Sequence, residues 1–359
     1  MRLSFLISDH GWGHLGRSLV VAAEVVSRGH ELQLVVSPAM AARVRDAVPG
    51  AAVCVGRLDQ GYIFGAGGRG ADAAASRALL SACATGPAPE LTAEVVAWRP
   101  DVVLADATPW ATVVARACGV PAVLASNFSW DDQYAGLFEG DSEAAPDVAT
   151  VRAQASMFDL ALEMPLGPGA PSVRTRRSVP LVGQRPAGRA TGLPSDRPLI
   201  TWAFGRTLPA AQPLAGLGAL ATLAKERGFA LVVNELLRDI AHDVAPDAIL
   251  LPDEAPWPDV LAASRIVVSK AGYSTLAEAL RGSGHVIATG VTGLPEERAM
   301  QRDIEARGLG LGVPVDAPDT AAAIAEAARH LIDLPERPPL DEAGEVDIVD
   351  ALEEIAPRQ

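Results

Sequence analysis

Histidine and glycine near the N-terminus are the first residues whose types and spacing could do chemistry. Residues 9–17 read Asp-His-Gly-Trp-Gly-His-Leu-Gly-Arg and follow a short apolar run. Glycine lets the backbone come close to a ligand, and neutral imidazole is available near pH 7, so His14 is a candidate general base. The alternative is that His14 only holds this segment by hydrogen bonds. For His10 we favour that structural role.

The same segment has the bare Gly-x-Gly-x-x-Gly spacing of a dinucleotide-binding turn, at Gly11, Gly13 and Gly16. Two histidines and an arginine would be unusual in a pyrophosphate cradle. The second expected strand ends at Ser37, without the acidic residue that binds a ribose in such sites. The pattern therefore argues against classical NAD or FAD binding.

Asp106 is a candidate partner for His14. It ends an apolar run at 101–105, just as the histidine segment follows the run at 3–7. The carboxyl ends of parallel strands meet at one edge of a sheet, where a carboxylate could orient the imidazole and stabilise its protonated form. The alternative is that Asp106 caps the helix that follows.

A second constellation lies at residues 268–280, which read Val-Ser-Lys-Ala-Gly-Tyr-Ser-Thr-Leu-Ala-Glu-Ala-Leu. An apolar run ends, small residues turn the chain, and a helix is expected to begin. Gly272, Ser274 and Thr275 at a helix N-terminus would hold phosphate oxygens, and Glu278 could accept hydrogen bonds from ribose hydroxyls. The alternative is a capping box of Ser274 or Thr275 with Glu278.

Other residues of the second half could complete a nucleotide site. The loop 251–257, which ends at Trp257, could frame a base, and Arg206 after the run at 199–204 could meet phosphates. Glu296 and Glu297 could accept hydrogen bonds from sugar hydroxyls. Their alternative role is that of a solvated acidic helix start.

Apolar runs and helical periodicity alternate along the chain, as is typical of doubly wound α/β domains. The first half is expected to hold strands at 3–7, 31–37, 101–105 and 121–125 and helices at 18–27, 110–118 and 146–157. The second half is expected to hold strands at 199–204, 230–234, 248–251, 266–269 and 285–289 and helices at 213–226, 258–263, 275–280, 299–307 and 321–332. The sequence therefore predicts an α/β fold of two Rossmann-like domains.

We expect an N-terminal domain at 1–185, a C-terminal domain at 186–340, and a segment at 341–359 whose acidic helix could pack back on the first domain. A Gly-, Pro- and Arg-rich stretch at 181–198 is the expected linker. The glycine-rich stretch 56–90 is expected to be a loop near the site.

Composition limits the partners. The 359 residues carry a formal net charge of −14, so the chain has no general attraction for nucleic acid or anionic membranes. Cys54, Cys83 and Cys118 are isolated and lack metal-ligand spacing. No apolar stretch approaches the roughly 20 residues of a membrane helix. We expect a cytoplasmic protein that binds neither nucleic acid nor a metal and has no integral membrane segment.

Taken together, these motifs resemble the GT-B glycosyltransferases, which have two Rossmann-like domains with a cleft between them. In the plant natural-product members, the His after Gly-x-Gly is the base of an inverting transfer, and its Asp partner follows a strand; here these are His14 and Asp106. Residues 269–280 are similar to the donor motif, whose small residues meet the pyrophosphate and whose Glu, here Glu278, meets the ribose. Glu297 stands where relatives usually carry Gln, which leaves the donor sugar open.

A closer resemblance is to the N-terminal glycosyltransferase-like half of plant L-arabinokinases, in the strings at 10–17, 126–131, 258–264 and 270–278. No kinase activity is implied. The resemblance places an acceptor beside His10, Trp12, Asn127, Trp130 and Asp131, and the donor beside Gly13, Trp257, Lys270, Gly272, Ser274, Thr275, Glu278, Glu296, Glu297 and Arg206. The alternative for residues 126–131 is a turn in which Ser129 caps a helix and Trp130 is core.

The sequence predicts an inverting, metal-independent glycosyltransferase without a cofactor. Its co-substrate would be a nucleotide diphosphate sugar, with a UDP-sugar favoured, and its acceptor a small molecule. Arg206, Ser274, Thr275 and the helix dipole would stabilise the leaving phosphate. We expect a monomer or homodimer. The alternatives are a nucleotide-sugar-binding module without catalysis and a nucleotide-sugar epimerase, which Glu297 leaves open.

Overall fold

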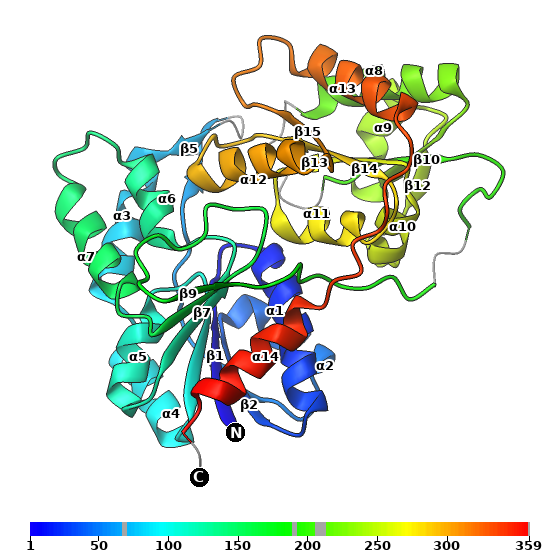
Figure 1. The fold of residues 1–359 in the computed structure, drawn as a ribbon. Helices are drawn as coiled ribbons and strands as arrows, with labels where there is room; N and C mark the ends of the chain where they lie inside the picture. The colour runs from blue at the N-terminus through cyan, green and yellow to red at the C-terminus, as the bar shows by residue number, and fades with distance from the viewer. Residues whose placement is uncertain (67–69, 189–191, 205–212, 358–359) are drawn as a thin grey trace.

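The N-terminal unit is built on a parallel seven-stranded sheet (Figure 1). The computed structural model describes residues 1–66, 70–188, 192–204 and 213–357. The strand order is β3-β2-β1-β6-β7-β8-β9. The strands are β1 (Arg2–Ile7), β2 (Glu31–Val36), β3 (Ala52–Val55), β6 (Val102–Asp106), β7 (Ala122–Ser126), β8 (Leu160–Glu163) and β9 (Arg176–Ser178). Its central strands are continuous apolar runs because helices cover both faces.

Seven helices and a short hairpin surround this sheet in the described ranges. They are α1 (Trp12–Ser27), α2 (Pro38–Ala47), α3 (Ala73–Thr85), α4 (Pro89–Trp98), α5 (Trp110–Cys118), α6 (Trp130–Leu137), α7 (Ala145–Ala155), and the antiparallel pair β4 (Ile63–Phe64) and β5 (Ala71–Asp72). One face of the sheet packs against α1 and α2, and the other packs against α4 and α5.

The C-terminal unit holds a second parallel sheet, in the order β12-β11-β10-β13-β14-β15. Its strands are β10 (Leu199–Trp202), β11 (Ala230–Asn234), β12 (Ile249–Leu251), β13 (Ile266–Lys270), β14 (His285–Thr289) and β15 (Gly310–Val313). Its helices are α8 (Pro213–Arg227), the 3-10 turn η2 (Glu235–Leu237), α9 (Arg238–Val244), α10 (Trp257–Ala263), α11 (Tyr273–Leu280), α12 (Pro295–Ala306) and α13 (Thr320–Asp333). The predicted α/β fold of two Rossmann-like units is confirmed.

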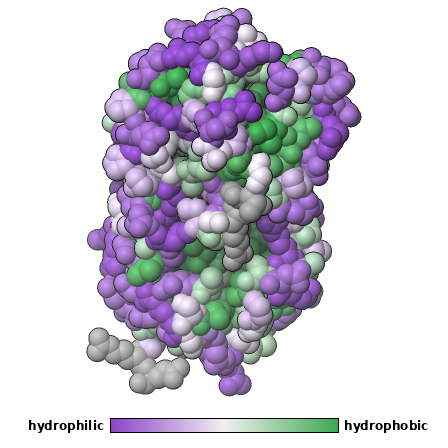
Figure 2. All heavy atoms as spheres, turned by 90° about the vertical axis from the view of Figure 1, so that its right-hand side faces the viewer, coloured by the Kyte–Doolittle hydropathy of each residue, from purple (hydrophilic) through white to green (hydrophobic). Residues whose placement is uncertain are grey.

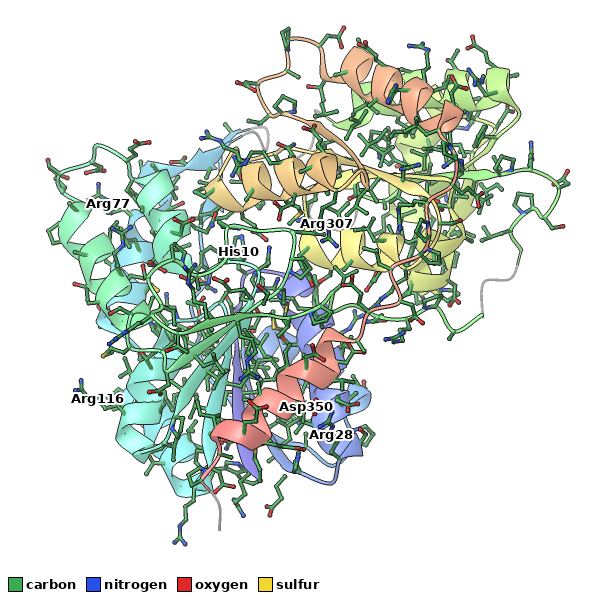
Figure 3. All side chains as sticks on the ribbon, viewed as in Figure 1. His10, Arg28, Arg77, Arg116, Arg307 and Asp350 are labelled. Atoms are coloured by element: carbon green, nitrogen blue, oxygen red, sulfur yellow. The ribbon has the colours of Figure 1, made fainter. Side chains whose placement is uncertain are left out.

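The last helix, α14 (Gly344–Ile355), lies against α1 of the first unit (Figure 1). Arg28 at the end of α1 pairs with Asp350, toward which it points in Figure 3, and His30 Nε2 lies 2.8 Å from Glu353 Oε1. Buried apolar residues of α14, including Ile348 and Leu352, belong to the same core cluster as α1. The end of the chain therefore ties back onto the N-terminal unit. The borders at 185 and 340 stay a prediction.

Two predicted element assignments were wrong. Residues 56–90 contain a hairpin, α3 and the start of α4 rather than one loop. The carboxylate of Asp72 accepts a hydrogen bond from the Ala75 N–H and caps α3, whose alanine-rich sequence favours a helix despite the glycines before it. Helix α1 begins at Trp12 rather than at residue 18, so His14 lies in a first helical turn and not in a loop.

One face of the surface is mostly hydrophilic, and the described helices are short or polar. Hydrophilic side chains predominate on the face in Figure 2, with smaller hydrophobic areas between them. Within the ranges that the structure describes, every helix is too short or too polar to cross a bilayer.

Candidate active site between the two units

His14 and Asp106 meet at the point where the first sheet reverses its strand order. Strands β1 and β6 are neighbours, and Ile7 at the end of β1 pairs with Asp106 at the end of β6. Gly11, with a φ of 102°, turns the chain from β1 into α1. The His14 Nδ1 atom lies 3.1 Å from Asp106 Oδ1. Ligands of open parallel sheets bind at such switch points, so the structure brings the predicted pair together where a ligand is expected.

Arg17 joins this pair, although no role for it was predicted from the sequence. Its Nε donates to Asp106 Oδ2 over 2.9 Å, and one terminal nitrogen pairs with Asp106 Oδ1. Ser18 Oγ donates to Asp106 Oδ2 over 2.9 Å. The alternative that Asp106 caps the next helix is therefore wrong, because its carboxylate is used by α1. Residues three apart lie on the same face of a helix, so the spacing of His14 and Arg17 could have indicated that both face Asp106.

Asp106 is ionised in this setting. It is fully buried, and burial by itself raises the pKa of a carboxyl group. The charge of Arg17 and the hydrogen bonds from Arg17 and His14 together outweigh burial and lower the Asp106 pKa below its ordinary value. A buried carboxylate is thus held charged beside the imidazole.

Asn127 connects this cluster to the second unit. Its Oδ1 accepts a hydrogen bond from Arg17, and its Nδ2 donates to Glu296 Oε1 over 2.9 Å. The Glu296 backbone N–H in turn donates to Gln133 Oε1 of α6 over 3.1 Å. The first turn of α12 therefore docks on the N-terminal unit, and Glu296 is not a solvated helix start.

Glu297 has a structural partner set instead of a free carboxylate. Its Oε2 accepts hydrogen bonds from the backbone N–H groups of Val291, Thr292 and Gly293, over 2.7 to 3.0 Å. The side chain is buried, and burial raises its pKa although these N–H groups act in the opposite direction. This oxygen closes the loop between β14 and α12, and the donor-sugar role of Glu297 stays a prediction.

The N-terminus of α11 touches the first turn of α1. Ser274 Oγ donates to the Gly13 carbonyl over 2.7 Å. Gly272 is the N-cap of α11, which has no side-chain cap, so the capping box of Ser274 or Thr275 with Glu278 does not form. Burial raises the pKa of Glu278 to about 8, and the charge of Arg43 opposes this shift.

Three further residues were predicted for the donor side, and the structure describes two of them. Lys270 ends β13, and burial lowers its pKa while the charges of Glu297 and Glu296 act to raise it. Trp257 begins α10, and its indole N–H donates to the Asp253 carbonyl over 3.2 Å. Arg206 lies outside the described residues.

The acceptor-side candidates divide into buried and accessible groups. His10, which lies between the two units in Figure 3, has its Nδ1 2.7 Å from the Gln60 carbonyl, as its favoured structural role requires. Burial lowers the pKa of His10 to about 3, so its ring is neutral. Trp12 is 40% exposed, with the Arg43 guanidinium over its ring.

Trp130 and Asp131 are core residues. Trp130 is 1% exposed and donates its indole N–H to Ser8 Oγ over 3.0 Å. The Asp131 carboxylate accepts hydrogen bonds from Ser129 and Ser172 and is 1% exposed. The expectation that these two side chains face a cleft is corrected. The alternative agrees with the structure in that Trp130 is core and Ser129 is the N-cap residue of α6, although the Ser129 side chain bonds Asp131 and not a helix N–H.

Comparisons with known proteins identify the fold. No family model matches the chain. It is 26% identical over 291 residues to L-arabinokinase from Arabidopsis thaliana, covering 77% of this chain and 27% of that protein, so it spans about a quarter of that relative. It is similar in structure to the glycotransferase of kitacinnamycin (TM-score 0.71, 19% identity, 99% of both chains). The chain has the GT-B fold.

Two further GT-B structures have similar shapes. Spinosyn rhamnosyltransferase SpnG aligns with a TM-score of 0.67 and 20% identity, over 98% of this chain and 100% of that one. UGT89C1 of Arabidopsis thaliana aligns with a TM-score of 0.66 and 15% identity, over 99% of both chains. The resemblance to GT-B proteins expected from the motifs is thus confirmed over the length of the chain.

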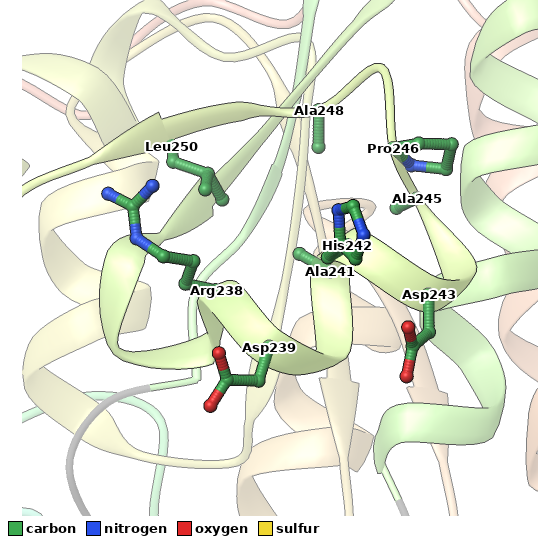
Figure 4. A pocket seen from close by; sticks show the side chains of 9 residues that line it. All are labelled: Arg238, Asp239, Ala241, His242, Asp243, Ala245, Pro246, Ala248 and Leu250. Carbon is green, nitrogen blue, oxygen red and sulfur yellow. The ribbon is translucent and has the colours of Figure 1, made fainter.

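A hollow of about 480 Å³ lies elsewhere on this GT-B chain, beside α9 and the start of β12 (Figure 4). Arg238, His242 and Leu250 are among the residues that line it. It contains none of the residues predicted for the donor or acceptor site. Among the described residues, no group of three or more His, Cys, Asp and Glu side chains is placed to hold a metal ion.

Proposed function

We propose that this chain is an inverting glycosyltransferase that moves a sugar from a nucleotide diphosphate sugar, with a UDP-sugar favoured, to a hydroxyl or amine of a small molecule. The observation that carries the proposal is the His14–Asp106 pair at the switch point of the first sheet. Gly13, the residue before His14, accepts a hydrogen bond from Ser274 at the N-terminus of α11. The GT-B neighbours support it, since SpnG has been solved with thymidine diphosphate and with spinosyn aglycone.

In the proposed reaction, His14 removes the proton of the acceptor through Nε2. Among the described residues, Nε2 makes no hydrogen bond, while Nδ1 faces Asp106. As the proton moves to Nε2, the carboxylate stabilises the imidazolium that forms. The acceptor oxygen or nitrogen then forms a bond to the anomeric carbon, and the bond from that carbon to the diphosphate breaks. Attack opposite the leaving group inverts the configuration.

The proposed donor site lies at the second unit. The N–H groups of the first turn and the dipole of α11 favour a diphosphate near Gly272 and Thr275, and Arg206 is the proposed cation for it. Fixed dipoles and a guanidinium can stabilise a leaving phosphate in the way a metal ion does, so we propose transfer without a metal. Residues 1–185 would then carry the acceptor side and residues 186–340 the donor side.

Nucleotide sugars test this function directly. A thermal-shift panel of UDP-, dTDP-, GDP- and ADP-sugars should identify the donor, since a ligand at about 100 times its Kd adds about 2.7 kcal/mol of stability. With that donor, His14→Ala should lower transfer or donor hydrolysis by a factor of about 10² to 10⁴ while the thermal shift remains. His242→Ala on α9 is the matched control and should retain activity.

The outcomes separate the competing functions. Full turnover by His14→Ala would contradict the assigned base. Conversion of the donor into an isomer would indicate an epimerase, and binding without any turnover would indicate a non-catalytic module.

A further inference from the structure

The Arg17 guanidinium is held from several sides beside the proposed base. It binds both carboxylate oxygens of Asp106, and it also donates to Ser126 Oγ over 3.1 Å and to Asn127 Oδ1. Its carbon Cζ lies 5.2 Å from the centre of the Tyr273 ring of α11. The side chain is 2% exposed. Arg17 therefore has one defined position, unlike the partner of a surface ion pair.

The hydrogen bonds around Arg17 select one tautomer of His14. One terminal nitrogen of Arg17 lies near three groups: Asp106 Oδ1, Ser126 Oγ and, at 3.0 Å, His14 Nδ1. That nitrogen carries two hydrogens. If Nδ1 had no proton, it would compete with Asp106 Oδ1 and Ser126 Oγ for two hydrogens, and its lone pair would face a carboxylate oxygen at 3.1 Å. Ser126 Oγ also accepts from the Phe128 N–H over 3.4 Å, so the repulsion between the lone pair and the carboxylate carries more weight than the count. With the proton on Nδ1, every acceptor receives a hydrogen and Nε2 keeps its lone pair.

The charge of Arg17 has a second effect on His14. A buried aspartate with an imidazole as its sole charged partner favours an imidazolium–carboxylate pair, and an imidazolium cannot accept a proton. The guanidinium neutralises Asp106 and places a positive charge next to the ring, which disfavours a second positive charge there. Among the described residues, His10 and Asp59 are the other titratable groups near His14, and burial lowers the pKa of His10 and raises that of Asp59.

We propose that Arg17 is a positioning residue that keeps His14 neutral, with the proton on Nδ1 and with Nε2 available to accept a proton. The use assigned to Nε2 rests on the proposed transferase function. The protonation state itself does not, because it is a property of the folded protein without substrates.

The test is ¹⁵N NMR of the histidine rings at pH 7, without donor or acceptor, with His14 assigned by the loss of its signals in His14→Asn. We expect wild type to carry one ring proton, on Nδ1. In Arg17→Met we expect protons on both ring nitrogens. Arg28→Met, which removes an arginine ion pair at the other end of α1, should leave the His14 signals unchanged. A neutral His14 with its proton on Nδ1 in Arg17→Met, or on Nε2 in wild type, would overturn the proposal.

A milder variant covers the case in which Arg17→Met fails to fold. Ser126→Ala leaves the guanidinium in place but removes one of its acceptors, so a hydrogen can turn toward His14 Nδ1. We expect a measurable fraction of the Nε2-protonated tautomer in this variant, and its absence would contradict the hydrogen count.

Turnover provides a second readout. Transfer by Arg17→Met should fall at least about tenfold at pH 7 and recover in part as the pH rises, with little change in donor KM. A loss that is equal at all pH values would indicate a merely structural Arg17. If His14→Ala kept full activity while the NMR result held, the transferase mechanism would fail and the role of Arg17 in protonation would stand.

Discussion

Two carboxyl groups of the candidate site, Asp106 in the N-terminal unit and Glu278 in the C-terminal unit, differ in how their charge is compensated. In the N-terminal unit, Asp106 is buried but binds Arg17, His14 and Ser18, so its charge is neutralised by the fold itself. In the C-terminal unit, burial raises the pKa of Glu278 to about 8, opposed by the charge of Arg43. The charge of Asp106 is thus held by its partners, whereas burial dominates at Glu278 and raises its pKa. This contrast is consistent with a fixed base, His14, in the first unit and with a carboxyl group in the second unit, Glu278, whose charge can change when a ligand binds.

The largest expected effect comes from breaking the compensated half. Asp106→Asn keeps the shape but leaves the buried Arg17 without its carboxylate. We expect the free energy of unfolding to fall by about 3 to 5 kcal/mol, because a buried charge then lacks its partner. Transfer activity should fall by a factor of about 10² or more, since the imidazolium loses its counter-charge. Urea unfolding and initial rates measure the two effects.

A matched control is Asp141→Asn, which removes the half-exposed ion pair with Arg77. Solvent screens that pair, so we expect a loss below about 1 kcal/mol. Equal losses in the two variants would show that Asp106 is no better compensated than a surface carboxylate.

Glu278, at which burial dominates, should show a pH-dependent effect of intermediate size. The folded-state pKa of Glu278 is about 8, above its ordinary value of 4.5. Between these values the folded protein keeps a proton that the unfolded chain has released, so the stability contributed by this group is present at low pH and is lost as pH rises through that window. Glu278→Gln should therefore gain about 1 kcal/mol relative to wild type between pH 5 and pH 8, with partial exposure limiting the size.

Thermal unfolding at the two pH values measures this gain. Glu226→Gln, an exposed glutamate of α8, is the control and should show no such gain. A Glu278→Gln curve parallel to that of wild type would mean that Glu278 is compensated like Asp106, and the contrast between the halves would disappear.

The smallest expected effect concerns the contact between the halves. Ser274→Ala removes the hydrogen bond to the Gly13 carbonyl. We expect a loss of about 1 kcal/mol in unfolding free energy and a few-fold rise in donor KM, because α11 is then less firmly held against α1. Ser283→Ala, which removes a bond to Glu336 on the surface, should leave donor KM unchanged. An unchanged donor KM in both variants would show that the contact between Ser274 and Gly13 does not contribute to donor binding.

Much of the fold could be predicted from the sequence, because apolar runs and turn residues are local signals. The helix Trp110–Cys118 and the strand His285–Thr289 were predicted with their observed borders. The errors lie where local signals conflict. The glycines at 61–70 concealed α3, whose start depends on the Asp72 cap. Gly11 is the N-cap of α1, so this helix begins at Trp12, earlier than the apolar periodicity indicated.

The sequence by itself determined that His14 and Asp106 would lie together, because each follows a strand and the carboxyl ends of parallel strands meet at one edge. Only the tertiary structure decided where Arg17, Asp131 and Glu297 point. Arg17 binds Asp106, Asp131 accepts a hydrogen bond from Ser172, and Glu297 accepts hydrogen bonds from three backbone N–H groups of its own loop. The physical reason is that a buried charge must find a partner, and the partners available are set by which elements pack together.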